Sequence, residues 1–239
     1  MRSLSLLSVL ALAACSNTSD AAAAPAAGTT RTFAITDFNA VSLRGSDDVD
    51  VRVGTGFSVR AEGPGADLDK LEIVRDGDTL QVGRKKNLAG FGWSSGRRGV
   101  KVFVTMPRIV TAQIAGSGNL AIDRVDGQRF GADAAGSGNL SIATLNVPDA
   151  RLRVAGSGNI DAKGRVERLT VELAGSGNIS AGGVKAGSAT VSLAGSGDVR
   201  ADVAGQARVS LVGSGNVDLG PQARCSISKT GSGDVRCGG

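Results

Sequence analysis

The stretch AGSGN occupies Ala115–Asn119, and six further copies of nearly the same motif follow it along the chain. The first glycines of the seven copies are 20, 20, 19, 20, 18 and 18 residues apart. A fixed period near twenty residues predicts a solenoid. Those glycines are Gly116, Gly136, Gly156, Gly175, Gly195, Gly213 and Gly231, and the Asn residues that close the motif are Asn119, Asn139, Asn159, Asn178 and Asn216.

Apolar and polar residues alternate on both sides of each motif. In the third copy Leu152 and Val154 flank Arg153 before the glycines, and Ile160 and Ala162 follow them. This alternation is typical of short strands with one buried face. A single apolar residue recurs eight to ten positions after the first glycine, which marks a brief third side. The pattern therefore predicts an all-β, single-stranded parallel β-helix with about 18–20 residues per coil.

The repeated motif is suited to a tight corner between two sides of a coil. Glycine accepts a positive φ at little steric cost, so two glycines around a Ser allow a sharp turn. Because the corner recurs once per coil, its Asn side chains are expected to stack into a hydrogen-bonded ladder. Asp198 and Asp234, which replace Asn in two copies, can still accept from backbone N–H groups. We expect the Ala before each motif to face inward.

The residues before the repeats predict irregular coils of the same stack. We assign residues 33–107 to irregular N-terminal β coils, continuous with the regular repeats of residues 108–239. RGSDD at Arg44–Asp48 resembles a degenerate corner, and LEIVRDGDTLQVG at Leu71–Gly83 predicts a hairpin. An open end of a solenoid is an exposed sheet edge, so these coils are expected to cap it.

The first residues indicate secretion. One Arg precedes the apolar run Leu4–Leu12, which is too short to span a membrane, and residues 1–14 are predicted to be a signal peptide. The segment LAAC at Leu12–Cys15 resembles the bacterial lipobox, which implies cleavage before Cys15 and lipidation of that residue; a plain signal peptide is the alternative. With Ser16 after the Cys, the resemblance implies an outer-membrane lipoprotein. Residues 15–32 are predicted to be a flexible tether.

The positive charge of the chain is local. The chain has 27 Lys and Arg against 22 Asp and Glu, and RKKNLAGFGWSSGRRG at Arg84–Gly99 holds five cations and no acid. The candidate binding loop consists of Arg84, Lys85, Lys86, Phe91, Trp93, Arg97 and Arg98. Arg suits phosphate and Trp suits a membrane interface or a sugar face, so anionic envelope glycan or lipopolysaccharide is the expected partner. The alternative is a solvated loop whose aromatics fold back on the stack. We expect no nucleic-acid partner, because the chain is predicted to lie outside the cytoplasm.

The sequence favours no reaction. The chain has no His, and GSG is not the elbow of a serine hydrolase, so we expect the repeated serines to be structural. The position that would hold calcium in a nonapeptide repeat is apolar here, so we expect neither a metal nor a cofactor. Two clusters of carboxylates leave carbohydrate cleavage as an alternative: Asp47, Asp48 and Asp50, and Asp123, Asp126 and Asp133.

Two cysteines remain after Cys15. Cys225 and Cys237 lie six residues on either side of Gly231, in positions that are apolar in other coils. In an oxidising envelope they favour a disulfide that closes the C-terminal end. Buried free thiols are the alternative, since a disulfide needs Cα atoms within ~7 Å.

The lipobox, the tether, FNAVSLRGSDDVDVRV from Phe38, the strand ending in VTMP and the serial GSGN/D corners together resemble the head GIN domain family. The resemblance implies a β-helical fold in a cell-surface or periplasmic setting, and it supplies no catalytic residues. We therefore expect a non-enzymatic, lipid-anchored envelope protein that acts as an adhesion, binding or structural module. The alternatives are a carbohydrate-active enzyme that uses Asp pairs, and a ligand-capture lipoprotein that uses the loop around Trp93. The oligomeric state stays open.

Overall fold

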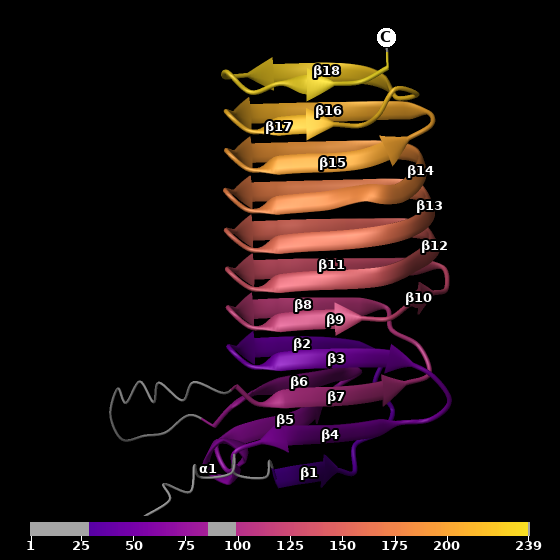
Figure 1. Ribbon diagram of the computed structural model, residues 1–239. Coiled ribbons are helices and arrows are strands. Elements are labelled where there is room, and N and C mark those ends of the chain that lie inside the picture. Colours follow the sequence, from indigo (N-terminus) through magenta and orange to yellow (C-terminus); the bar gives the residue numbers. More distant parts are fainter. Residues whose placement is uncertain (1–28, 86–98, 239) are drawn as a thin grey trace, which may run out of the picture.

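The computed structural model describes residues 29–85 and 99–238. Strands stack into an upright β-solenoid, with the N-terminal part at the lower end and the C-terminus at the upper end (Figure 1). This confirms the predicted parallel β-helix. The strands are β1 (Thr29–Phe33), β2 (Ala40–Gly45), β3 (Asp48–Val53), β4 (Ser58–Gly63), β5 (Leu71–Asp76), β6 (Thr79–Arg84), β7 (Lys101–Met106), β8 (Thr111–Gly116), β9 (Asn119–Ile122), β10 (Val125–Asp126), β11 (Arg129–Gly136), β12 (Asn139–Gly156), β13 (Asn159–Gly175), β14 (Asn178–Gly195), β15 (Asp198–Val203), β16 (Gln206–Gly213), β17 (Asn216–Asp218), β18 (Arg224–Thr230) and β19 (Val235–Arg236), and the helix is α1 (Gly65–Leu68).

Two walls meet at the glycine corners. The front wall consists of the strands that follow a corner, with β1, β4 and β7 beneath them. It runs upward in the order β1, β4, β7, β3, β9, β12, β13, β14, β15, β17 and β19. The back wall consists of the strands that precede a corner, in the order β5, β6, β2, β8, β11, β12, β13, β14, β16 and β18. Strands β12, β13 and β14 belong to both walls because each continues from one corner to the next.

Between the walls lies a thin core of aliphatic side chains. In the strands that lie between the two outermost strands, β1 and β18, every second residue points inward, and these positions hold mainly Val, Leu, Ile and Ala, which are at most 8% exposed. Among the buried residues that the structure describes, Phe38 and Phe130 are the only aromatic ones. Each large aliphatic side chain stabilises the fold by roughly 1.5–3 kcal/mol when buried, so repetition compensates for the thinness of the core.

The two glycines of each corner are required for different reasons. The first has a positive φ, as at Gly116 (138°) and Gly136 (110°), where L side chains are strained. A Cβ at Gly136 would also lie 2.5 Å from the carbonyl oxygen of Gly116 in the coil below. The second glycine has no such φ, but a Cβ at Gly138 would overlap the carbonyl oxygen of Gly118 and lie 2.8 Å from Ile114 Cγ2. Backbone conformation therefore explains the first glycine, and the close stacking of coils explains the second.

The Asn residues form a ladder up the corner column. Asn139 Nδ2 donates to Asn119 Oδ1 at 3.0 Å, Asn159 Nδ2 to Asn139 Oδ1 at 2.8 Å, and Asn178 Nδ2 to Asn159 Oδ1 at 3.0 Å. Asn178 donates to Asn159 Oδ1 through its backbone N–H as well, at 3.1 Å, whereas Asp198 cannot donate from its side chain and only its backbone N–H donates to Asn178 Oδ1, at 3.1 Å. The ladder ties each coil to the next from outside the core.

The expected inward position of the Ala before each motif is wrong. Ala115, Ala135, Ala174 and Ala194 are exposed, and Ala155 is partly exposed. The reason is the alternation itself, since the positions two and four residues before the first glycine point inward. The residue next to the glycine therefore faces solvent, and the five Ala residues form a smooth column on the back wall.

At the N-terminal end, the chain order differs from the order of the coils in space. Strands β2 and β3 form a coil that is parallel to β8 and β9 above it and to β6 and β7 below it. Gly45 pairs with Gly116, so RGSDD is the lowest member of the corner column. Strands β5 and β6 form an antiparallel hairpin, and β1, β4 and β7 pair antiparallel beneath the front wall. Among the described helices none has the length and apolarity to cross a membrane.

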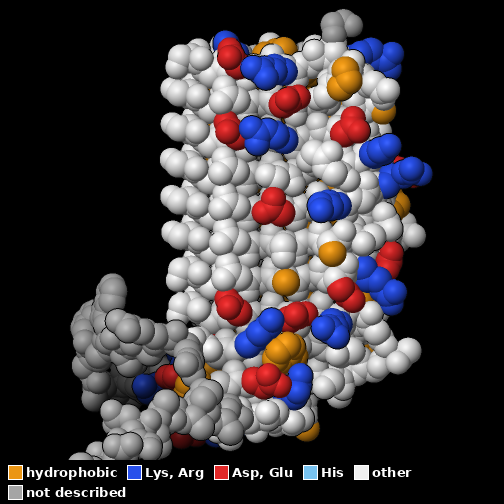
Figure 2. Space-filling model, viewed as in Figure 1, with side chains coloured by type: hydrophobic (Ala, Val, Ile, Leu, Met, Phe, Trp, Pro, Cys, Tyr) orange, Lys and Arg blue, Asp and Glu red, His pale blue; other side chains and the backbone are white. Residues whose placement is uncertain are grey.

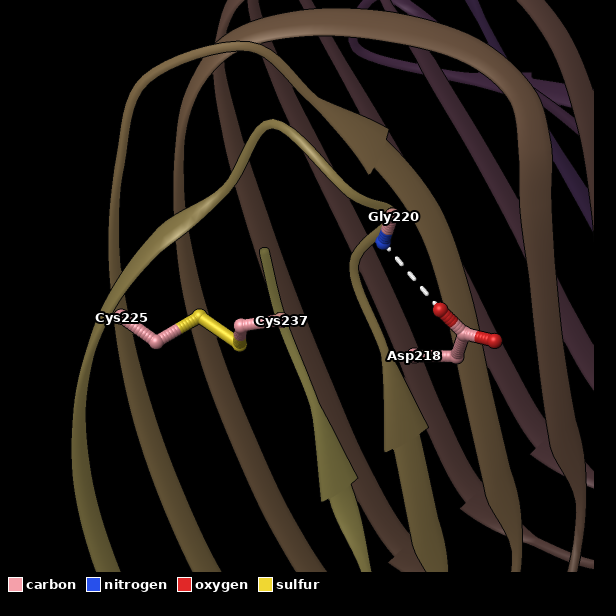
Figure 3. The surroundings of a disulfide bond; sticks show 4 residues. All are labelled: Asp218, Gly220, Cys225 and Cys237. Carbon is pink, nitrogen blue, oxygen red and sulfur yellow. Dashed lines mark hydrogen bonds between the residues drawn. A yellow bond between two sulfur atoms is a disulfide. The ribbon is translucent and has the colours of Figure 1, made fainter. Parts of the chain in front are cut away.

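A disulfide closes the coil at the C-terminal end. It joins Cys225, at the start of β18, to Cys237, just after β19, and their Cα atoms are 6.2 Å apart (Figure 3). Nearby, Asp218 Oδ1 accepts from the backbone N–H of Gly220 at 3.1 Å. Because the last coil has no described neighbour above it, Ile227 of β18 keeps 49% of its surface exposed. The covalent link thus holds together the last coil of the described stack.

Candidate binding groove on the front wall

A groove of about 690 Å³ lies along the front wall, which faces the viewer in Figure 2. This volume is within the usual range of small-molecule sites. The residues that line the groove come from six levels of the stack, those of β3, β9, β12, β13, β14 and β15. Its described lining consists of Asp50, Arg52, Ala121, Ile122, Asp123, Ser141, Ile142, Ala143, Asp161, Ala162, Lys163, Ser180, Gly182, Gly183 and Arg200.

The groove is hollow because the repeat is irregular at this place. In three successive pairs of coils the register shifts where the front wall ends and the chain bends toward the third side; the shifts lie between Ile142 and Leu145, Asp161 and Lys163, and Ala181 and Lys185. β-Bulges of this kind bend a strand and are common beside functional sites. The outward residues here are also small, namely Ala121, Ala143, Gly182 and Gly183.

Charged groups at the lower end of the groove are engaged by their neighbours. Asp123 Oδ1 accepts from the backbone N–H groups of Val53 at 2.9 Å and Arg124 at 2.6 Å. Asp50 lies 3.9 Å from Arg52 and 3.8 Å from the ammonium group of Lys101. These contacts tie together the coils at the lower end of the groove and partly neutralise its charge there.

Two cations at the upper end of the groove are not engaged. Lys163 of β13 and Arg200 of β15 are exposed, and neither side chain has an ion pair or hydrogen bond with any described residue. The stem of Lys163 lies across Gly183, since a Cβ at Gly183 would be 2.8 Å from Lys163 Cγ. Arg200 Cβ lies 4.0 Å from the place a Cβ on Gly182 would take. The glycine pair is therefore a gap between two cationic side chains.

Two cations on the back wall, Arg151 and Arg168, by contrast have carboxylate partners. Arg168 Nε donates to Asp149 Oδ1 at 2.5 Å, and Arg151 donates to Glu172 at 2.7 Å. The hydrogen bond from Arg168 lowers the pKa of Asp149, and the same bond raises the pKa of Arg168. Both pairs are exposed, so salt screens them.

Of the candidate binding loop, the structure describes only Arg84 and Lys85. Arg84 donates through two nitrogens to the fully buried carboxylate of Asp47, and this hydrogen bond is the main reason that the pKa of Arg84 is raised. Asp47 Oδ1 also accepts from the backbone N–H of Val100 at 3.1 Å, so one carboxylate holds both chain segments that flank residues 86–98. Lys85 Nζ donates to the backbone oxygen of Asp69 at 2.9 Å.

The other residues of that hypothesis lie outside the described residues. They are Lys86, Phe91, Trp93, Arg97 and Arg98, together with the lipidation candidate Cys15. The two described cations at the base of the loop make internal contacts, so any binding by this loop depends on its remaining members.

The two carboxylate clusters noted in the sequence are divided by the fold. Asp47 is buried against Arg84, whereas the neighbouring Asp48 accepts from Asn119 Nδ2 at 2.8 Å. Asp123 belongs to the front wall, but Asp133 lies on the back wall in β11. Among the described residues no three His, Cys, Asp or Glu side chains gather closely enough to hold a metal ion.

Sequence reasoning missed the groove. Its signal was present but weak: small residues replace polar ones at outward positions such as Ala121 and Ala143, and Gly182–Gly183 follows a repeat of 19 rather than 20 residues. None of these features belongs to the conspicuous motif, and their proximity depends on the register of stacking.

Comparisons with known proteins point the same way as the fold. Residues 37–223 match the family described as "Putative auto-transporter adhesin, head GIN domain". A crystal structure titled as a putative adhesin from Bacteroides fragilis superimposes with a TM-score of 0.80 at 20% identity, covering 89% of this chain and 98% of that one. A putative lipid binding protein from Parabacteroides distasonis gives a TM-score of 0.69 at 21% identity, covering 89% and 97%. A putative adhesin from Parabacteroides merdae gives 0.65 at 16%, covering 89% and 96%. A search of curated proteins found no match.

Proposed function

The chain belongs to the head GIN domain family of adhesin-like proteins, and from this premise we propose that it is a non-enzymatic binding module whose contact surface is the front-wall groove. The observation that carries the proposal is the shape of the groove. Its lining spans six coil levels, which corresponds to about 24 Å along the stack at the usual spacing of paired strands. A straight channel on a rigid wall suits an extended ligand that lies along the solenoid axis.

The absence of a recognisable reaction centre among the described residues supports a non-enzymatic role. The sequence has no His to activate a serine, and the corner serines repeat in equivalent places. Carboxylates that could have formed a glycosidase pair serve other purposes, since Asp47 holds Arg84 and Asp48 joins the Asn ladder. Of the members of the two clusters that line the groove, Asp50 lies beside Lys101, and Asp123 accepts from backbone N–H groups.

We place the protein in the bacterial envelope, at the outer membrane, on its periplasmic face or at the cell surface. The adhesin-like family supports an envelope or surface location. The finer part of the proposal is a lipid on Cys15, which would tether the solenoid through residues 15–32. Anionic envelope glycan or lipopolysaccharide at the loop around Trp93 stays a proposal as well.

The test is retention of envelope material by the immobilised mature chain. Ala143→Phe fills the groove, and Ala194→Phe is the matched control, because both Ala residues are exposed and face outward on different walls. We expect Ala143→Phe to reduce retention at least tenfold and Ala194→Phe to retain as much as the wild type. Equal retention by the two variants would refute the groove as the contact surface. Release of reducing sugar ends from the retained material would refute the non-enzymatic role.

A further inference from the structure

The two free cations of the groove flank a single coil. Lys163 pairs in register with Gly183, and Arg200 pairs with Ser180, so β13 and β15 carry the cations while β14 passes between them. Each neighbouring strand lies about 4.8 Å from β14. Between the cations β14 exposes Gly182 and Gly183, which add no side chain. A compact anion above this glycine pair would thus have a cation on either side.

Further positive charge surrounds this position. Arg165 and Lys185 are in register with each other and line a depression that shares Gly183 with the groove. Neither forms an ion pair or side-chain hydrogen bond with a described residue, whereas the back-wall cations Arg151 and Arg168 do. Asp161 lines the same groove, Glu167 the same depression, and Asp202 and Asp218 a further depression beside Lys185 and Arg200, yet none of these carboxylates forms an ion pair with the four cations. Four unpaired cations within three coils favour an anionic group as ligand.

Part of the groove floor between the charged ends is aliphatic, while Ser141, Asp161 and Ser180 line the same stretch with polar groups. Below the glycine pair the exposed aliphatic side chains are Ala121 and Ala143, and the neighbouring Ile122, Ile142 and Ala162 are only 2% exposed, so they add apolar floor beneath them rather than open surface. The described lining contains no aromatic side chain on which a sugar ring could stack. An alkyl chain fits such a surface, because it gains by leaving water and needs no hydrogen-bond partners.

We propose that the groove binds a lipid phosphate, with the phosphate above Gly182–Gly183 between Lys163 and Arg200 and an acyl chain along the aliphatic floor toward β9. This assignment rests on the proposed function, because it uses the same groove as contact surface. It goes further by naming the ligand class and the residues that hold each part of the ligand. The guanidinium of Arg200 can bind two phosphate oxygens, while the ammonium of Lys163 acts as a point charge.

The proposal is tested by calorimetric titration of the mature chain carrying Cys15→Ser, so that no lipid of its own can compete. The probes are dodecyl phosphate below its critical micelle concentration, inorganic phosphate, and dodecyl maltoside. We expect saturable binding of one dodecyl phosphate, and binding at least tenfold weaker for each of the other two. Lys163→Ala/Arg200→Ala should weaken dodecyl phosphate at least tenfold, and Ala121→Leu should weaken it by a similar factor.

Controls on the back wall match each variant. Arg208→Ala/Arg224→Ala removes the same charge, and Ala174→Leu adds the same volume to an exposed Ala; both should bind within twofold of the wild type. Equal weakening by the charge variants, equal binding of dodecyl maltoside, or equal binding of inorganic phosphate would overturn the proposal. If the wild type retains envelope material but does not bind dodecyl phosphate, the lipid assignment fails while the proposed function stands. If it does neither, both fail.

Discussion

Removal of the Asp47 carboxylate should selectively loosen the lower end of the solenoid. Asp47 is fully buried, and it holds Arg84 at the end of β6 and the backbone N–H of Val100 just before β7. The substitution Asp47→Ala would leave a guanidinium that is about two-thirds buried without its counter-charge. It would also leave a buried N–H group, since Val100 is only 1% exposed.

The expected loss follows from these two consequences. Breaking a buried ion pair by removing one partner typically costs 3–5 kcal/mol, but the 31% exposure of the Arg84 side chain allows water to replace part of the contact, so about 2 kcal/mol is appropriate here. An orphaned buried N–H adds about 1 kcal/mol or more. We therefore expect Asp47→Ala to lower the free energy of unfolding by about 3 kcal/mol, and Asp47→Asn to cost less because an amide oxygen can still accept.

The assay is urea unfolding followed by circular dichroism, together with hydrogen exchange of the β6 and β7 amides. Asp69→Ala is the matched control, because Asp69 pairs with Arg31 at 2.7 Å but its side chain is 71% exposed. An exposed pair contributes about 0–1 kcal/mol. If Asp47→Ala costs no more than Asp69→Ala, or if hydrogen exchange in β6 and β7 is unchanged, Asp47 does not hold β6 and the start of β7 together.

Three further perturbations test the stack. Gly177→Ala should cost about 1–3 kcal/mol in urea unfolding, because its Cβ would overlap a backbone oxygen of the coil below although its φ is ordinary; an unchanged midpoint would contradict the packing argument. Asp198→Asn should stabilise by about 0.5–1 kcal/mol and raise the melting temperature, because it restores a side-chain donor to Asn178 Oδ1; no rise would show that the ladder adds nothing. The hydrogen bond from Arg168 lowers the pKa of Asp149. The pair therefore stabilises the folded state at pH values above the ordinary carboxyl pKa, and this stabilisation is lost as the pH falls and Asp149 becomes protonated. The difference in melting temperature between wild type and Asp149→Asn should therefore shrink below about pH 4, and a constant difference would exclude the pair as its source.

The repeat made the fold predictable, because a period near twenty with alternating apolar positions allows few architectures. The sequence could not show that the β2–β3 coil is stacked between two coils that come later in the chain. Strands are joined by backbone hydrogen bonds, and these do not depend on which side chains the neighbouring strand carries. The prediction that the Ala before each motif faces inward was wrong, because a small residue is compatible with both a tight interior and an exposed surface. The site residues Lys163 and Arg200 lie 37 positions apart, and only the register of β13, β14 and β15 brings them to one groove.

The position of the groove follows from how a solenoid accommodates repeats of unequal length. Successive coils differ by one or two residues, and the difference has to be absorbed somewhere around the coil. The corner cannot absorb it, because glycine packing and the Asn ladder fix each corner directly above the last. The register shifts lie instead at the far end of the front wall, in three successive pairs of coils. Because the corner has the same geometry in every coil, the irregular residues collect at the opposite end of the front wall. The groove lies there, and it is the place where the repetitive surface differs enough from coil to coil to bind a ligand.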